Sequence, residues 1–406
     1  MSEATMEVPT WLNVEFLEKV FKSEDLKEDL KVVSFDTKLA TAAGDNYLSL
    51  MYRVSVQITT RGQSEKRSLI IKCQPAGEAI HKVTTDYQVF EFEAKMLQEV
   101  LPAMHKLLQE ANIENFSPFS AKCLYSHFGA PAHILVLEDL KETGFEMSDR
   151  AAGLNQEHCM MVMKKIAQFH AASLVLKQKN PELLEPFIDP PSKNMVLDLF
   201  SDYFKRFLPD LCKEIDENCQ ELNTFNERIL KLAEDGIERW GEGRAGKQNE
   251  FSVLAHGDIW LNNMMFRYSP DNCLVDMRFV DYQLSLWTSP AVDLLYFLNS
   301  SPAMDLLTDQ TMFIEEYHRV LGETLSALGY QHLHISLDHL NQLLESRGHF
   351  ATLVVFSIRN VVMGHDEGAF DVEEVAKKDQ VSFKFSRNYL ESLQIQIPLL
   401  DKSGCF

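Results

Sequence analysis

The sequence predicts an α+β protein of two lobes, in which a small antiparallel sheet with one helix pair precedes a larger, mainly helical lobe. Residues 48–58 alternate strictly between apolar and polar side chains, which is the period of a half-buried strand. Helical periodicity instead dominates residues 195–240 and 303–360. With 406 residues the chain is long enough for two cores, and we expect the lobes to comprise residues 1–138 and 139–406.

The composition is that of an ordinary globular protein, with 45% apolar and 24% charged residues. The net charge of -21 repels phosphate backbones, so neither nucleic acid nor an anionic membrane is expected as a partner. The 7 cysteines form no CxxC pair, and no signal peptide or long apolar run is visible. We therefore expect reduced thiols and a cytoplasmic location, and the oligomeric state stays open, with a monomer compatible.

The N-terminal lobe begins with an amphipathic helix over residues 9–21, which we expect to pack on the sheet without chemistry of its own. The strand at 48–58 and a second one at 67–73 flank a glycine-bearing turn and predict a hairpin. Before it, a loop of small residues contains Gly44 and Asn46, and its amides could approach phosphates. Because this loop has a single glycine, an ordinary turn fits it as well.

Two charged residues of this lobe are expected to meet. Lys72 lies at the end of an apolar strand, and Glu93 lies on the inward face of a helix that begins near Val89. A buried carboxylate requires a cation, so the pattern favours a Lys72–Glu93 ion pair over two exposed charges. Thr85 with Gln88 predicts a capping box at the start of this helix.

Further along the chain, residues 119–140 predict two strands, and the second leads through acidic residues into a connector. A long helix follows over 155–177, where His170 is expected to be a buried, hydrogen-bonded packing residue. Residues 238–250 are polar and contain glycines, so we interpret them as a loop. A second hairpin is expected from strands at 264–267 and 273–280.

The most informative stretch is His-Gly-Asp-Ile-Trp-Leu-Asn-Asn at 256–263, followed by Asp281 at the end of the second hairpin. Phosphoryl transfer requires an acid that orients a hydroxyl, and amide or carboxylate oxygens that hold Mg²⁺. Asp258, Asn263 and Asp281 supply this set. Singly these residues could be turn formers, but the whole set favours phosphoryl transfer. Asp293 is expected to cap a helix and could brace the loop through its amides.

The order of these motifs resembles the ecdysteroid kinase-like family, also called CHK kinase-like. This family lies within the aminoglycoside phosphotransferase and choline kinase branch of the protein-kinase-like fold. The resemblance covers nearly the whole chain, and the block at 256–263 is its most specific part. The last 100 residues or so carry little of the signature. Two departures, Leu97 and Tyr282, stand at apolar packing positions and leave the chemistry intact.

The resemblance implies that ATP binds between the two lobes with Mg²⁺. It assigns Asp258 as the catalytic base or hydroxyl orienter, and Asn263 and Asp281 as metal ligands. The nucleotide would be contacted by Lys72, which Glu93 fixes, by the loop of Gly44 and Asn46, and by backbone groups of Glu138 and Leu140.

These residues predict an ATP-dependent phosphotransferase that acts on the hydroxyl of a small molecule. That the acceptor is lipophilic, such as an ecdysteroid, a steroid-like molecule or a xenobiotic alcohol, is implied by the resemblance alone. A kinase for choline, ethanolamine or another small molecule is an alternative, as is a catalytically inactive ligand-binding protein. Intact Lys72, Asp258, Asn263 and Asp281 argue against the inactive protein, and the absence of an APE-type segment argues against a protein kinase.

Overall fold

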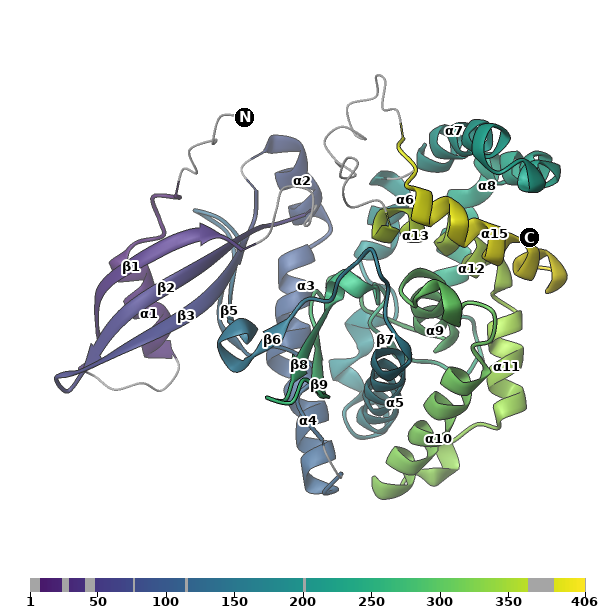
Figure 1. Cartoon of the computed structure of the whole chain (residues 1–406). Coiled ribbons are helices and arrows are strands. Elements are labelled where there is room, and N and C mark those ends of the chain that lie inside the picture. The colour runs from purple at the N-terminus through teal and green to yellow at the C-terminus, as the bar shows by residue number, and fades with distance from the viewer. Residues whose placement is uncertain are drawn as a thin grey trace. The chain divides into compact units, whose positions relative to one another are not determined.

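The computed structural model describes residues 8–23, 29–40, 48–75, 77–113, 116–199, 202–363 and 383–405 (Figure 1). Contacts divide the chain into two compact units. Unit 1 comprises Met1–Glu99 and Ser120–Phe145, and unit 2 comprises Val100–Phe119 and Glu146–Phe406. The sequence placed the boundary after residue 138, whereas residues 100–119 group with unit 2 because α4 (Leu101–Glu110) packs against α5 (Gln156–Lys179).

Unit 1 is built on a five-stranded antiparallel sheet with the order β1-β2-β3-β5-β4. The strands are β1 (Lys31–Leu39), β2 (Leu50–Thr60), β3 (Gln63–Cys73), β4 (Cys123–His127) and β5 (Ile134–Glu138). The predicted hairpin and the two later strands are confirmed. Strand β1 was not predicted, because it is an edge strand in which Val32 alone is buried, so its sequence lacks a clear alternation.

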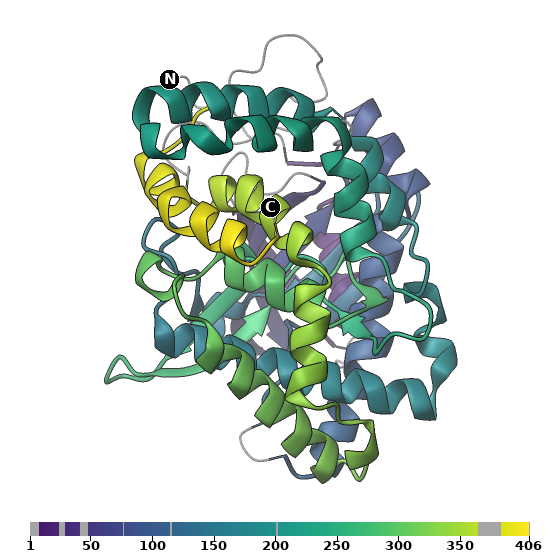
Figure 2. The same ribbon diagram turned by 90° about the vertical axis from the view of Figure 1, so that its right-hand side faces the viewer.

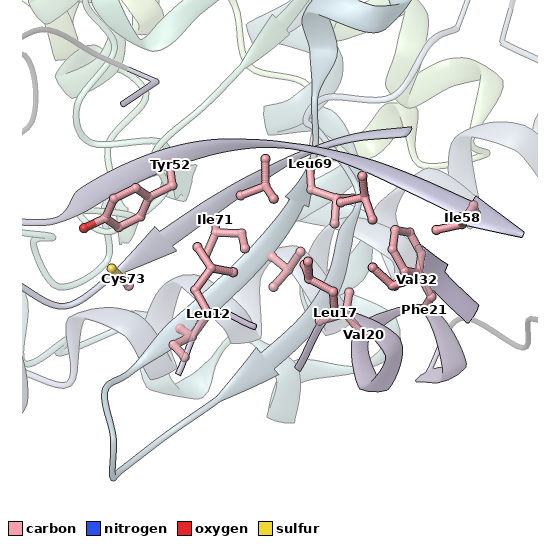
Figure 3. Close-up of a cluster of buried hydrophobic side chains, with 14 of the residues drawn as sticks. Leu12, Leu17, Val20, Phe21, Val32, Tyr52, Ile58, Leu69, Ile71 and Cys73 are labelled. Atoms are coloured by element: carbon pink, nitrogen blue, oxygen red, sulfur yellow. The ribbon is translucent and has the colours of Figure 1, made fainter. Parts of the chain in front are cut away.

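The core of unit 1 lies between this sheet and α1 (Val14–Ser23), as Figure 3 shows. The helix buries Leu17, Val20 and Phe21, and strand β2 turns alternate residues from Tyr52 to Ile58 toward them. The side chains of β2 between these positions stay more exposed, as the period of two requires. The packing role expected for the first helix is thus confirmed.

The helical part of unit 1 differs from expectation at one point. Helix α2 (Glu78–Asp86) precedes α3 (Val89–Lys95), and Thr85 lies inside α2. The Thr85 hydroxyl accepts a hydrogen bond from Gln74 Nε2 at 3.0 Å, and Gln88 has a left-handed backbone with φ 51°. The predicted capping box is therefore wrong, because Thr85 belongs to the preceding helix α2, and Gln88 directly precedes α3 without a side-chain cap hydrogen bond.

Unit 2 is mainly helical, which confirms the predicted α+β class. Besides α4 and α5 it contains α6 (Ser192–Leu199), α7 (Tyr203–Asn218), α8 (Asn226–Arg244), α9 (Ala291–Ser300), α10 (Thr311–Ala327), α11 (Leu337–Glu345), α12 (Gly348–Phe356), α13 (Ile358–Met363) and α15 (Arg387–Lys402). Helix α7 packs along α8, and α15 packs against α12 and α13 (Figure 2). Among the described helices, α5 alone is long and apolar enough to cross a membrane, but 78% of that stretch is buried, as in a core helix.

Helix α8 extends further than the sequence indicated. Residues 238–244, which we expected to be part of a loop, form its last two turns. A Cβ atom added at Gly243 would lie 2.7 Å from Cβ of Phe350 in α12, so this glycine lets the two helices approach closely. Gly243 thus serves helix packing, whereas residues 245–250, which include Gly246, form the loop that we expected.

Short strands of unit 2 frame the 256–263 segment. Strand β7 (Val253–Ala255) enters it and pairs with β10 (Leu286–Thr288). Strands β8 (Met264–Tyr268) and β9 (Leu274–Phe279) form the predicted second hairpin. Asp258 thus lies in the loop that leads into β8, and Asp281 follows the end of β9, which pairs with the start of β8.

Candidate active site

The backbone of the 256–263 loop is fixed at Gly257. This residue has φ +81°, and a Cβ atom there would collide with the carbonyl oxygen of Leu284. Only glycine fits both the conformation and the space. The loop ends in a short 3-10 turn (Leu261–Asn263), so Asn263 lies at the end of the loop and Asp258 directly follows Gly257 near its start.

Asp293 lies in the first turn of α9 but does not cap this helix, whose N-cap is Pro290 without a side-chain hydrogen bond, so the expected cap is wrong. The side chain of Asp293 instead holds the 256–263 loop. Its carboxylate accepts hydrogen bonds from the amides of His256 (2.7 Å) and Gly257 (2.9 Å). His170 Nε2 lies 3.1 Å from the same carboxylate, and both side chains are fully buried. Burial alone would raise the pKa of Asp293, but these hydrogen bonds and the nearby histidines hold the pKa below its usual value. The predicted brace and the buried, hydrogen-bonded state of His170 are both confirmed.

The carboxylate of Asp258 has a partner on each oxygen. The Tyr296 hydroxyl donates to Oδ1 at 2.6 Å, and Asn263 Nδ2 donates to Oδ2 at 2.9 Å. Asn263 Nδ2 also donates to the Asp258 carbonyl at 2.9 Å. Burial and the charge of Asp281 raise the pKa of Asp258 to about 6, although the hydrogen bond from Tyr296 acts to lower it. The group thus stays largely ionised at neutral pH and can accept a proton.

Asp281 follows directly on the strand end that contacts the loop. The Val280 amide donates to the Asn263 carbonyl at 3.0 Å, and Asp281 has a left-handed backbone with φ 66°. Its charge acts on both Asp258 and His256. The structure therefore brings Asp258, Asn263 and Asp281 together in unit 2, as the sequence predicted.

Asn263 and Asp281 fit a magnesium ion by their chemistry. Because Nδ2 of Asn263 donates to Asp258, the amide presents Oδ1 to a metal, and Asp281 offers carboxylate oxygens. Mg²⁺ prefers oxygen ligands and is commonly held by one or two protein groups together with substrate phosphates. Among the residues that the structure describes, no group of three or more His, Cys, Asp or Glu side chains is placed to hold a metal ion.

Two residues beside Asp258 escaped the sequence analysis. Tyr296 lies three residues after Asp293, on the same face of α9, and this spacing could have identified it. Arg244, at the end of α8, was hidden by the incorrect loop prediction. It is buried, donates from Nη2 to the Leu284 carbonyl at 3.1 Å, and interacts electrostatically with Tyr296, Asp258 and Asp293.

In unit 1 the predicted pair of Lys72 and Glu93 is present. Lys72 Nζ lies 2.7 Å from Glu93 Oε2, with side chains 3% and 2% exposed. Lys72 comes from β3 and Glu93 from α3, so a strand and a helix that are separate in sequence present the two charges to each other. A lysine so deeply buried requires such compensation.

The connector residues also lie in unit 1. Glu138 ends β5 and donates its amide to the Lys122 carbonyl at 3.0 Å, and Leu140 opens a 3-10 turn (Leu140–Thr143). Between them Asp139, which the sequence analysis passed over, accepts hydrogen bonds from Arg53 and Ser68, each at 2.7 Å. This buried carboxylate anchors the connector to β2 and β3. Gly44 and Asn46 lie outside the described residues.

A match to a family model agrees with the motifs. The model of the ecdysteroid kinase-like family matches residues 43–330. This range contains the pair of Lys72 and Glu93 as well as Asp258, Asn263 and Asp281. No curated protein matches the chain. Among solved structures it is similar to a Plasmodium vivax ethanolamine kinase, at 14% identity and a TM-score of 0.44, over 96% of this chain and 89% of that one. It is also similar to the GDP complex of wild-type aminoglycoside 2'-phosphotransferase-IIIa, at 10% identity and a TM-score of 0.36, over 96% and 98% of the two chains.

Proposed function

Because the chain belongs to the ecdysteroid kinase-like family, we propose that it transfers the γ-phosphate of ATP to a hydroxyl group of a small lipophilic molecule. The observation that carries this proposal is the state of Asp258. Its carboxylate is held on both oxygens, by Tyr296 and Asn263, within a loop whose backbone Asp293 fixes. A carboxylate fixed in this way suits a group that must orient a hydroxyl.

The reaction needs one proton acceptor and one leaving group. The acceptor hydroxyl gives its proton to the Asp258 carboxylate while its oxygen forms a bond to the γ-phosphorus. The bond from that phosphorus to the bridging oxygen breaks, and ADP leaves with the electron pair. Magnesium, when bound by Asn263 and Asp281, would neutralise charge on the phosphate oxygens.

The buried pair in unit 1 supports a role in nucleotide binding. We assign to Lys72 a contact with the ATP phosphates, with Glu93 fixing the ammonium group at 2.7 Å. The backbone at Glu138 and Leu140 is assigned to adenine, and Asp139 holds this connector through Arg53 and Ser68.

The surroundings of Asp258 favour an uncharged acceptor. The rings of Tyr296, Trp240 and Phe350 pack on one another, with centroids 6.1 Å apart for Trp240–Tyr296 and 5.0 Å for Trp240–Phe350. Rings packed together in this way do not form an open cage for a quaternary ammonium group. This packing supports a lipophilic alcohol over choline.

The proposal is tested by measuring ATP consumption by the purified protein with steroids, xenobiotic alcohols and choline-like amines, and by locating the phosphate on the product by mass spectrometry. We expect turnover with at least one lipophilic alcohol and none by Asp258→Ala with the same compound. Turnover of the choline-like amines alone would show that the acceptor is an amino alcohol and not a lipophilic alcohol. No turnover, together with no thermal stabilisation by Mg-ATP, would indicate a ligand-binding protein and overturn the proposal.

A further inference from the structure

The contact between Tyr296 and Asp258 joins two side chains that come from different elements of unit 2. The donor is a phenol of α9, the acceptor is a carboxylate of the 256–263 loop, and the O–O distance is 2.6 Å. This distance is typical of a short hydrogen bond to an ionised acceptor. Tyr296 is 2% exposed, so water does not compete for its hydroxyl.

The ring of Tyr296 cannot readily turn away from this position. It packs edge-on against Trp240 of α8 and lies near Phe350 of α12, with centroids 6.1 and 6.4 Å away. Side chains in such a packed interior occupy rotamer minima and have little free space to move into. The hydroxyl is thus aimed at Asp258 by packing from three helices, and not by the loop itself.

Helix α9 therefore holds both the backbone of the loop and one of its side chains. Asp293 fixes the backbone through the amides of His256 and Gly257, and Tyr296, one turn later, fixes the side chain of Asp258. Residues three apart lie on one helix face, so a rigid helix sets both contacts at once. The two contacts together determine where the Asp258 oxygens lie.

We propose that Tyr296 is a positioning residue for the transfer reaction, which directs one Asp258 oxygen toward the acceptor hydroxyl; this inference rests on the function proposed above. A carboxylate has about four lone-pair positions on its two oxygens. Tyr296 and Asn263 each occupy one of them, which limits the directions from which an acceptor hydroxyl can approach. Tyr296 touches neither substrate in this scheme and acts through Asp258.

The test compares Tyr296→Phe with Tyr389→Phe, using the best lipophilic acceptor from the panel. Tyr389 is also fully buried, but its hydroxyl donates to the Phe356 carbonyl at 3.3 Å, apart from Asp258. Both variants keep the ring and remove one buried hydroxyl. We expect kcat to fall about 10- to 100-fold in Tyr296→Phe, the range of a lost hydrogen bond to a charged group, with the KM for ATP unchanged. Tyr389→Phe should retain the wild-type kcat.

A double variant separates positioning from a general structural effect. If Tyr296 acts through Asp258, then adding Tyr296→Phe to Asp258→Asn should cause no further loss of the residual rate. An equal loss in both backgrounds, or a Tyr296→Phe enzyme as active as Tyr389→Phe, would overturn the positioning role and leave the proposed function standing. A wild-type protein without any transferase activity would overturn the proposed function, and this inference with it.

Discussion

The Nζ atom of Lys72 lies 2.7 Å from Oε2 of Glu93 in the interior of unit 1, where both side chains are almost fully buried. Burying two charges carries a desolvation penalty that their attraction often fails to offset. Apolar residues of similar size would stabilise the unit at least as well. We therefore infer that the pair is retained for nucleotide binding and not for stability.

This inference predicts different outcomes for a single and a double substitution. Glu93→Gln should lower the free energy of unfolding by about 3–5 kcal/mol, because the buried ammonium loses its charged partner, and it should raise the KM for ATP. Lys72→Met combined with Glu93→Leu should recover most of the stability and still lack activity. Urea unfolding and ATP kinetics measure the two effects. A stable double variant that remains active would show that the pair has no role in ATP binding.

The metal assignment predicts a specific defect in Asp281→Asn. Replacing one carboxylate oxygen ligand by an amide should shift the magnesium dependence of turnover to higher concentration, because a hard cation binds an amide less strongly. The fold should persist, since Asp281 is partly exposed. Magnesium titration at saturating ATP provides the measurement, with Asp271→Asn, in the exposed β8–β9 turn, as the matched control. Superimposable titration curves for the two variants would remove Asp281 from the site.

Asp293 is predicted to matter more for loop geometry than for overall folding. In Asp293→Asn one of its two oxygens becomes an NH₂ group, so one loop amide, of His256 or Gly257, loses its acceptor. A buried amide without an acceptor costs about 1–3 kcal/mol, and the displaced loop should reduce kcat about 100-fold, as misplacements of about 1 Å do. Thermal unfolding and single-turnover kinetics report the two effects. Wild-type kinetics in a destabilised Asp293→Asn would mean that the brace serves folding alone.

The sequence predicted the parts of this site that depend on local motifs. Asp258, Asn263 and Asp281 could be grouped because a short loop and a strand end bring them together, whatever the remaining packing is. Lys72 and Glu93 could be paired because charges on buried faces require partners. In each case the physical requirement is visible in the residues themselves.

What escaped prediction depends on how helices pack. Arg244 was assigned to a loop because its neighbouring glycines suggested a turn, whereas Gly243 serves the close approach of α8 and α12. Strand β1 lacks alternation because it is an edge strand. The hydrogen bond between Arg53 and Asp139 depends on β2 and β5 lying in the same sheet. Tertiary contacts of this kind leave no periodic signal along the chain.

His105 in α4 leads to a prediction about acid stability. Its Nε2 accepts a hydrogen bond from the Phe119 amide at 3.0 Å, which requires the neutral ring. Burial, together with the charges of Lys165 and Arg278, lowers the pKa of His105 from 6.5 to about 4. Between these two values the unfolded chain binds a proton that the folded protein does not. The free energy of unfolding contributed by this group is therefore complete above pH 6.5 and is lost as the pH falls toward 4.

The variant His105→Gln isolates this effect, because glutamine offers an acceptor to the Phe119 amide and does not titrate. Between pH 7 and pH 5 the titration of His105 should lower the free energy of unfolding of the wild-type protein by about 2 kcal/mol, because each pH unit below 6.5 costs about 1.4 kcal/mol. Over the same pH range the free energy of unfolding of His105→Gln should therefore fall by less than that of the wild type, and the difference should equal this contribution. Urea unfolding at several pH values measures both proteins. Other acidic groups titrate equally in both proteins, so parallel curves for the two would show that His105 is protonated alike in the folded and unfolded chains.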